Sequence, residues 1–102
     1  MSFSRGVYGP GEIGDDFGEV RIPIEATDYV FSGKKVHEHV YVNYSGRCVY
    51  VTTYELPDGK YRLLRNNPGW GKELTAPVRP SALRVKYPRI ARDLGHVEEV
   101  RL

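Results

Sequence analysis

Two histidines separated by one residue, in His37-Glu38-His39, are the side chains of this sequence best suited to acid–base chemistry. In an extended strand, residues two apart project from the same face, about 6 to 7 Å apart along the strand. Such a pair could supply the base and the acid that cleave RNA without a metal ion, if cations stabilised the transition state. A small, toxin-like, metal-independent ribonuclease acting through His37 and His39 is therefore one hypothesis for this chain.

Metal binding by the same pair would need a third ligand, and His96 is the only other histidine. Positions 43 and 44 are Asn and Tyr, where a cupin-like site would have a glutamate nearby. The single cysteine, Cys48, lies in an apolar run and is expected to be a small buried residue. We therefore expect neither a metal nor another cofactor.

The strongest functional signal is a basic segment that runs from Lys60 to Arg92. It holds nine basic residues against one acid, Glu73, and so carries a charge of +8 in a protein whose net charge is +2. Such a segment favours a polyanionic partner, because lysine and arginine neutralise phosphates and release condensed counterions. Its charges could instead form a solvated face or pair with the acidic first half of the chain.

Aromatic residues accompany these charges and could stack on bases. Trp70, between two glycines and next to Lys72, could serve that purpose or could fold the surrounding loop onto the core. The residues expected to contact nucleic acid are Lys60, Arg62, Arg65, Trp70, Lys72, Arg79, Arg84, Lys86, Arg89, Arg92, Tyr41, Tyr50 and Tyr54.

A hairpin is the clearest element that would position these side chains. Residues 36–42 and 47–54 are rich in β-branched and aromatic residues, and the turn residues 43–46 lie between them. Pairing the valines of the two strands face to face predicts an aliphatic core side. It also predicts an opposite surface formed by His37, His39, Tyr41, Tyr50, Thr52 and Tyr54.

Other strands are expected on both sides of this hairpin. Alternation predicts strands at 19–25, with Pro23 at a sheet edge, and at 28–31, 61–65, 83–87 and 96–102. Residues 66–80 are expected to form a long loop, and a helical turn is expected to follow Pro88. The pattern predicts an all-β barrel or sandwich, SH3-like or OB-like, of five to seven short strands with one short helical turn near the C-terminus.

The length of 102 residues fits a single β domain over residues 19–102, preceded by a flexible glycine-rich arm over residues 1–18. No apolar stretch is long enough to cross a membrane and no signal peptide is recognisable, so a cytoplasmic location without membrane contact is expected.

We expect a non-enzymatic module that binds RNA or single-stranded DNA. Besides the ribonuclease, the open alternative is a viral, assembly or inhibitor protein that acts through protein contacts or self-association.

Overall fold

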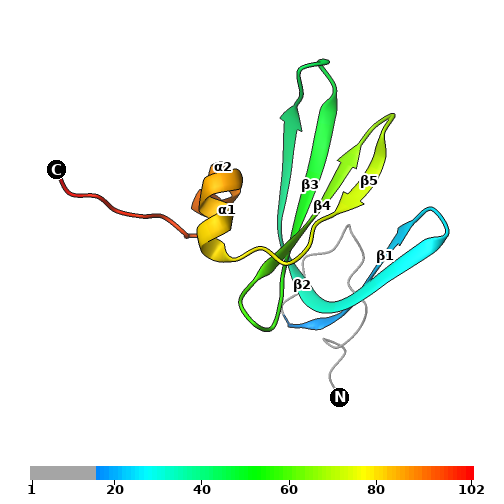
Figure 1. Cartoon of the computed structure of the whole chain (residues 1–102), viewed down its shortest axis with the longest axis horizontal. Helices are drawn as coiled ribbons and strands as arrows, with labels where there is room; N and C mark the ends of the chain where they lie inside the picture. The colour runs from blue at the N-terminus through cyan, green and yellow to red at the C-terminus, as the bar shows by residue number, and fades with distance from the viewer. Residues whose placement is uncertain (1–15) are drawn as a thin grey trace.

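The structure, a computed structural model, describes residues 16–102 and is mostly β. Five antiparallel strands lie in the order β1-β2-β3-β4-β5, and contacts between β1 and β5 bring the sheet close to a closed barrel (Figure 1). Two short helices follow. The elements are β1 (Gly18–Ile24), β2 (Thr27–Val42), β3 (Cys48–Glu55), β4 (Tyr61–Asn67), β5 (Gly71–Leu74), α1 (Pro80–Lys86) and α2 (Pro88–Asp93). The predicted small all-β barrel with helical structure near its C-terminus is confirmed. The predicted arm over residues 1–18 falls almost entirely outside the described residues.

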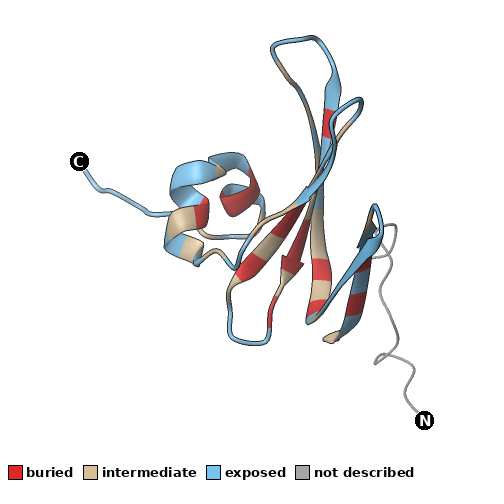
Figure 2. Cartoon of the chain, turned by 45° about the vertical axis from the view of Figure 1, so that its right-hand side comes forward, coloured by how far each residue is buried: buried red, intermediate tan, exposed pale blue. Residues whose placement is uncertain are grey.

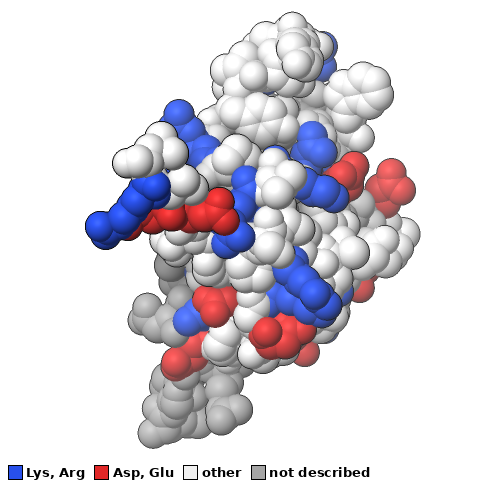
Figure 3. All heavy atoms as spheres, turned by 60° about the vertical axis from the view of Figure 1, so that its left-hand side comes forward, with Lys and Arg blue, Asp and Glu red and all other residues white. Residues whose placement is uncertain are grey.

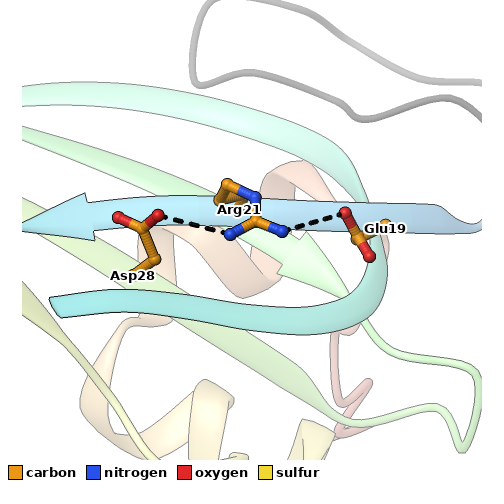
Figure 4. A network of polar contacts seen from close by, with 3 residues as sticks. All are labelled: Glu19, Arg21 and Asp28. Carbon is orange, nitrogen blue, oxygen red and sulfur yellow. Dashed lines mark hydrogen bonds and ion pairs between the residues drawn. The ribbon is translucent and has the colours of Figure 1, made fainter.

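The β1–β2 hairpin forms one edge of the sheet, as Pro23 had indicated. Val20 and Ile22 point into the core, while Arg21 lies on the outer face. Its guanidinium bridges Glu19 at 3.6 Å and Asp28 at 3.3 Å (Figure 4). All three side chains are about half exposed, so these ion pairs contribute little to stability.

Strand β2 is a single strand of sixteen residues where two separate strands were predicted. Its first half pairs with β1 as far as Gly33, and its second half, from Lys34 to Val42, pairs with β3. A β-bulge between Lys35 and His37 lies close to this change of partner. The strand therefore links the β1–β2 hairpin to the β2–β3 hairpin and lets the sheet curl.

The predicted face assignment of the β2–β3 hairpin is wrong. Tyr41 lies opposite Val49 and His39 lies opposite Val51, so the histidines share a face with the core valines. Val40, opposite Tyr50, faces the other way and is exposed. The outward face also carries Val42 and Cys48, so the expectation of a buried cysteine is wrong as well.

The turn explains this register. The Asn43 N–H donates to the Arg47 carbonyl at 2.9 Å, which leaves a loop of three residues ending at Gly46. Gly46 has φ 77°, a left-handed conformation that glycine adopts without strain. A loop of three residues pairs odd-numbered residues with odd-numbered residues. It therefore places His39 and Tyr41, not Val40, beside the buried valines of β3.

The core lies on both sides of the sheet (Figure 2). One cluster joins the sheet to the two helices and consists of Val49, Val51, Tyr61, Leu63, Leu83, Ile90 and Ala91. The other lies under the β1–β2 hairpin and consists of Val20, Ile22, Tyr54 and Leu64. Tyr54 is 0% exposed and packs edge-on against Phe31, so the prediction that it belongs to an aromatic surface is wrong.

The C-terminal third differs most from the prediction. Leu83 to Tyr87, expected as a strand, lies in and just after α1, where Leu83 is buried and Val85 is 81% exposed. Strands β4 and β5 occupy part of the expected long loop, and residues 96–102 form neither helix nor strand. None of the helices in the described region is long and apolar enough to cross a membrane.

Candidate nucleic-acid interface

A cleft of about 280 Å³ lies between the sheet and the joint of the two helices. The sheet contributes one wall and the helices contribute the other and the rim. The residues that line the cleft are His39, Tyr41, Val51, Lys86, Tyr87, Pro88, Arg89 and Ile90. The cleft therefore combines three planar side chains, an apolar floor and two cations.

The local sequence explains how these residues meet. The register of the β2–β3 hairpin turns His39 and Tyr41 toward the helices. Pro88 starts α2 only two residues after α1 ends, because proline favours the first position of a helix. Tyr87 occupies the joint between the helices. Ile90 anchors α2 in the core while Arg89 stays exposed beside the cleft.

The cations at the rim differ in how they are held. Arg65 donates a hydrogen bond from Nη2 to the Tyr41 hydroxyl at 3.2 Å and lies 3.7 Å from Glu73. The hydrogen bond to Tyr41 is the main cause that raises the pKa of Arg65. Lys86 and Arg89, by contrast, have no ion-pair partner within residues 16–102 and are exposed. Their charges are therefore available to an anion.

The two histidines of the His-Glu-His motif have different surroundings. His37 lies 2.9 Å from the Asp93 carboxylate through Nε2, so its imidazole is engaged with α2. His39 lines the cleft, and its ring stacks 6.3 Å from that of Tyr41. His96 bonds to the Tyr61 hydroxyl at 2.5 Å instead of joining the other two. Over the described part of the chain, no three His, Cys, Asp or Glu side chains form a group that could hold a metal ion.

The structure distributes the predicted contact residues over several surfaces, with acidic side chains between the basic ones (Figure 3). Tyr41, Lys86 and Arg89 meet in the cleft, and Arg65 adjoins it through Tyr41. Arg62 donates to the Thr75 carbonyl and lies over the Phe31 ring, on the side of the sheet that faces β1.

The remaining predicted residues lie elsewhere. Tyr50 and Lys72 line a second cleft of about 310 Å³ on the opposite face of the sheet. Trp70 does not fold the loop onto the core, because it is 84% exposed at the β4–β5 turn. Arg84 and Arg92 line a separate hollow with His96. Arg79 is exposed just before α1, and Lys60 is half-buried in the β3–β4 turn, 3.9 Å from Asp58.

Tyr87 is an aromatic residue of the cleft that the predicted contact set omits. It lies between Lys86 and the Pro88-Arg89 pair, and its ring also packs against the core. The sequence did contain a signal for Tyr87. It is an aromatic residue directly before a proline that starts a helix, and cations lie on both sides of it.

Searches for related proteins give no further information. Neither the protein-family models nor the curated proteins nor the solved structures contain a match to this chain.

Proposed function

We propose that this protein binds single-stranded nucleic acid, and that the cleft between the sheet and the helix pair holds a base. One observation carries the proposal: His39, Tyr41 and Tyr87 line the same cleft whose rim carries Lys86 and Arg89. Planar side chains provide stacking partners for unpaired bases, and nearby cations hold the phosphates that link them. The second cleft, with Tyr50 and Lys72, has fewer cations and is the less suitable surface.

The placement of the cations favours a strand over an isolated base. Lys86 and Arg89 are exposed at the rim, where a phosphate would pass as the base enters the cleft. Arg65 lies close by, positioned by Tyr41, although Glu73 partly offsets its charge. Duplex nucleic acid buries its bases in the stack, so a cleft that takes a base selects single strands, loops or ends.

The experiment is a titration of the full chain against labelled single-stranded RNA, single-stranded DNA and duplex at two salt concentrations. We expect both single strands to bind more tightly than duplex, with affinity that falls as salt rises. Lys86→Glu should weaken binding by about tenfold and reduce the salt slope by about 1.

Arg84→Glu is the matched control, because it makes the same change of charge sign in the same helix but lines a different hollow. We expect it to bind nearly as well as the wild type. Equal losses in both variants would mean that net charge, and not the cleft, drives binding. A wild type that binds nothing at low salt would overturn the proposal outright.

A ribonuclease remains the second candidate, and one observation favours it: His39 lies in the cleft beside Lys86 and Arg89. An imidazole next to bound phosphate could accept the proton of the ribose 2′-hydroxyl as that oxygen attacks phosphorus. The imidazolium could then return a proton to the 5′-oxygen as its bond to phosphorus breaks. Of the pair, His39 is the one that a substrate in the cleft would reach, because Nε2 of His37 contacts Asp93 and its Nδ1 is buried. Cleaved RNA in the titration, lost in His39→Ala while binding persists, would establish this activity.

A further inference from the structure

Strand β2 has an edge that pairs with no other strand of the described structure. The second half of β2, from Lys34 to Val42, pairs with β3 on one side. On the other side, the pairing with β1 ends at Gly33, and residues 16–102 supply no further strand there. Figure 2 shows this part of the β2–β3 hairpin extending beyond the helix pair.

The hydrogen-bond pattern shows which backbone groups lie along this edge. In an antiparallel pair, successive residues direct their N–H and C=O groups to opposite sides. Asn43 donates its N–H to Arg47 across the hairpin, so the odd-numbered residues of this stretch bond to β3. The N–H and C=O groups of Glu38, Val40 and Val42 therefore point to the unpaired edge.

The side chains along the edge do little to discourage another strand. Val40 is 50% exposed and Val42 is 65% exposed. Residues 36–42 contain neither proline nor lysine, the residues that commonly protect sheet edges. Their only carboxylate, Glu38, forms an ion pair with Lys35. The bulge at Lys35/His37 lies before this stretch, which leaves the pairing from His37 to Val42 regular.

We propose that two copies of this chain associate through this edge, antiparallel and two-fold symmetric, with Val40 opposite Val40 of the second copy. This register satisfies the backbone groups of Glu38, Val40 and Val42 together, because Glu38 lies opposite Val42 of the second copy. It also sets His39 opposite Tyr41, so like charges do not face each other. A register centred on Glu38 would oppose two carboxylates. The paired stretch is short, so the dimer is weak and depends on concentration.

The experiment is sedimentation equilibrium of the full chain over a wide concentration range, without nucleic acid. We expect a monomer–dimer equilibrium. Val40→Lys opposes two ammonium groups at the two-fold axis and should raise the dimer dissociation constant by at least about tenfold. Val42→Lys places its ammonium group opposite Glu38 of the second copy and should lower that constant. Opposite effects of one substitution type at neighbouring positions would identify the register.

Two controls keep the result interpretable. Val85→Lys makes the same change at an exposed valine of α1 and should leave the equilibrium unchanged. Val40→Pro should also yield monomers, and circular dichroism of each variant checks that the fold persists. This substitution removes an N–H that points away from β3, so the intramolecular ladder survives.

Three results would overturn the proposal. They are a wild type that stays monomeric at its highest soluble concentration, a Val40→Lys variant that dimerises as the wild type does, and edge amides that are protected from hydrogen exchange in the monomer. The last result would show that another segment of the same chain, such as residues 1–15, covers the edge. None of these results depends on nucleic-acid binding, so either proposal can fail alone.

Discussion

At the scale of single residues, Tyr54 carries a buried hydroxyl that no side chain or backbone group of residues 16–102 satisfies. Its side chain is 0% exposed, and its hydroxyl has no hydrogen-bond partner among the described residues. Burial raises the pKa of Tyr54 from 10.0 to about 12, because the phenolate would lose its hydration in the core. A buried hydroxyl without a partner costs about 1 to 3 kcal/mol of desolvation.

Tyr54→Phe should therefore stabilise the protein at neutral pH, by about 1 kcal/mol in the free energy of unfolding. The pH dependence has a definite sign. The pKa of Tyr54 is higher in the folded protein than in the unfolded chain, so the unfolded chain loses this proton first. The free energy of unfolding is therefore unaffected by Tyr54 ionisation below pH 10 and falls as the pH rises toward 12. The wild type should thus lose more stability than the variant over that interval, as measured by urea unfolding.

Tyr29→Phe is the control for this measurement, since Tyr29 is exposed and its replacement should change stability by less than about 0.5 kcal/mol. A marked loss of stability in Tyr54→Phe at neutral pH would show that the hydroxyl has a partner in solution, and would contradict the reasoning.

At the scale of elements, the sequence predicted where the strands of the central hairpin lie better than it predicted which side of the sheet their side chains occupy. The β2–β3 hairpin was located correctly, because its β-branched and aromatic residues and its turn residues are strong local signals. The facing depends on whether the loop holds three or four residues, which one hydrogen bond between Asn43 and Arg47 decides. The glycine at the end of the turn was the available clue.

The segment around Leu83 illustrates a second limit. Leu83, Val85 and Tyr87 alternate like a strand, but Leu83 and Tyr87 are also four residues apart, as on one helix face. In the structure this segment is helical: Leu83 is buried in the core, Tyr87 packs against the core directly after α1, and Val85 is exposed. So short a pattern fits both periods, and packing against the sheet selects one. This choice places Lys86 at the cleft, so the site could not be assembled from the sequence alone.

Helix α2 depends on contacts with the sheet, because its six residues are too few for a helix to be stable by itself. Ile90 and Ala91 pack in the core, and Asp93 accepts a hydrogen bond from His37. We expect Asp93→Ala to lower the free energy of unfolding by about 1 kcal/mol. We also expect faster hydrogen exchange at the Ala91 amide, as measured by NMR.

Glu98→Ala provides the comparison, since it removes an exposed carboxylate beyond the helix. If both variants matched the wild type in stability and exchange, the bond between His37 and Asp93 would have no role in holding α2.

At the scale of the whole molecule, the charge of the basic segment does not form one surface. Its cations lie on both faces of the sheet, around the helices and in the β3–β4 turn, and Lys86 and Arg89 are the two that line the cleft with aromatic side chains. The linear count of charges therefore indicated a class of partner but could not indicate the surface. We place the proposed site at the cleft because planar groups and cations meet there.

The two proposals meet at this scale. Residues opposite each other in an antiparallel pair share a face, so His39 and Tyr41 of both copies would line one side of the combined sheet. The two clefts would then open on the same side, and a sufficiently long single strand could occupy both. Two linked binding events strengthen each other without any new contact.

We therefore expect a single-stranded nucleic acid several times longer than one cleft requires to bind more tightly than a short one, by about tenfold or more. Val40→Lys should remove this advantage and leave the short strand unaffected, because Val40 faces away from the cleft. Fluorescence anisotropy with the two strands, in wild type and variant, measures both effects. If Val40→Lys weakened the short strand equally, the loss would originate within one copy, and the link between pairing and binding would be wrong.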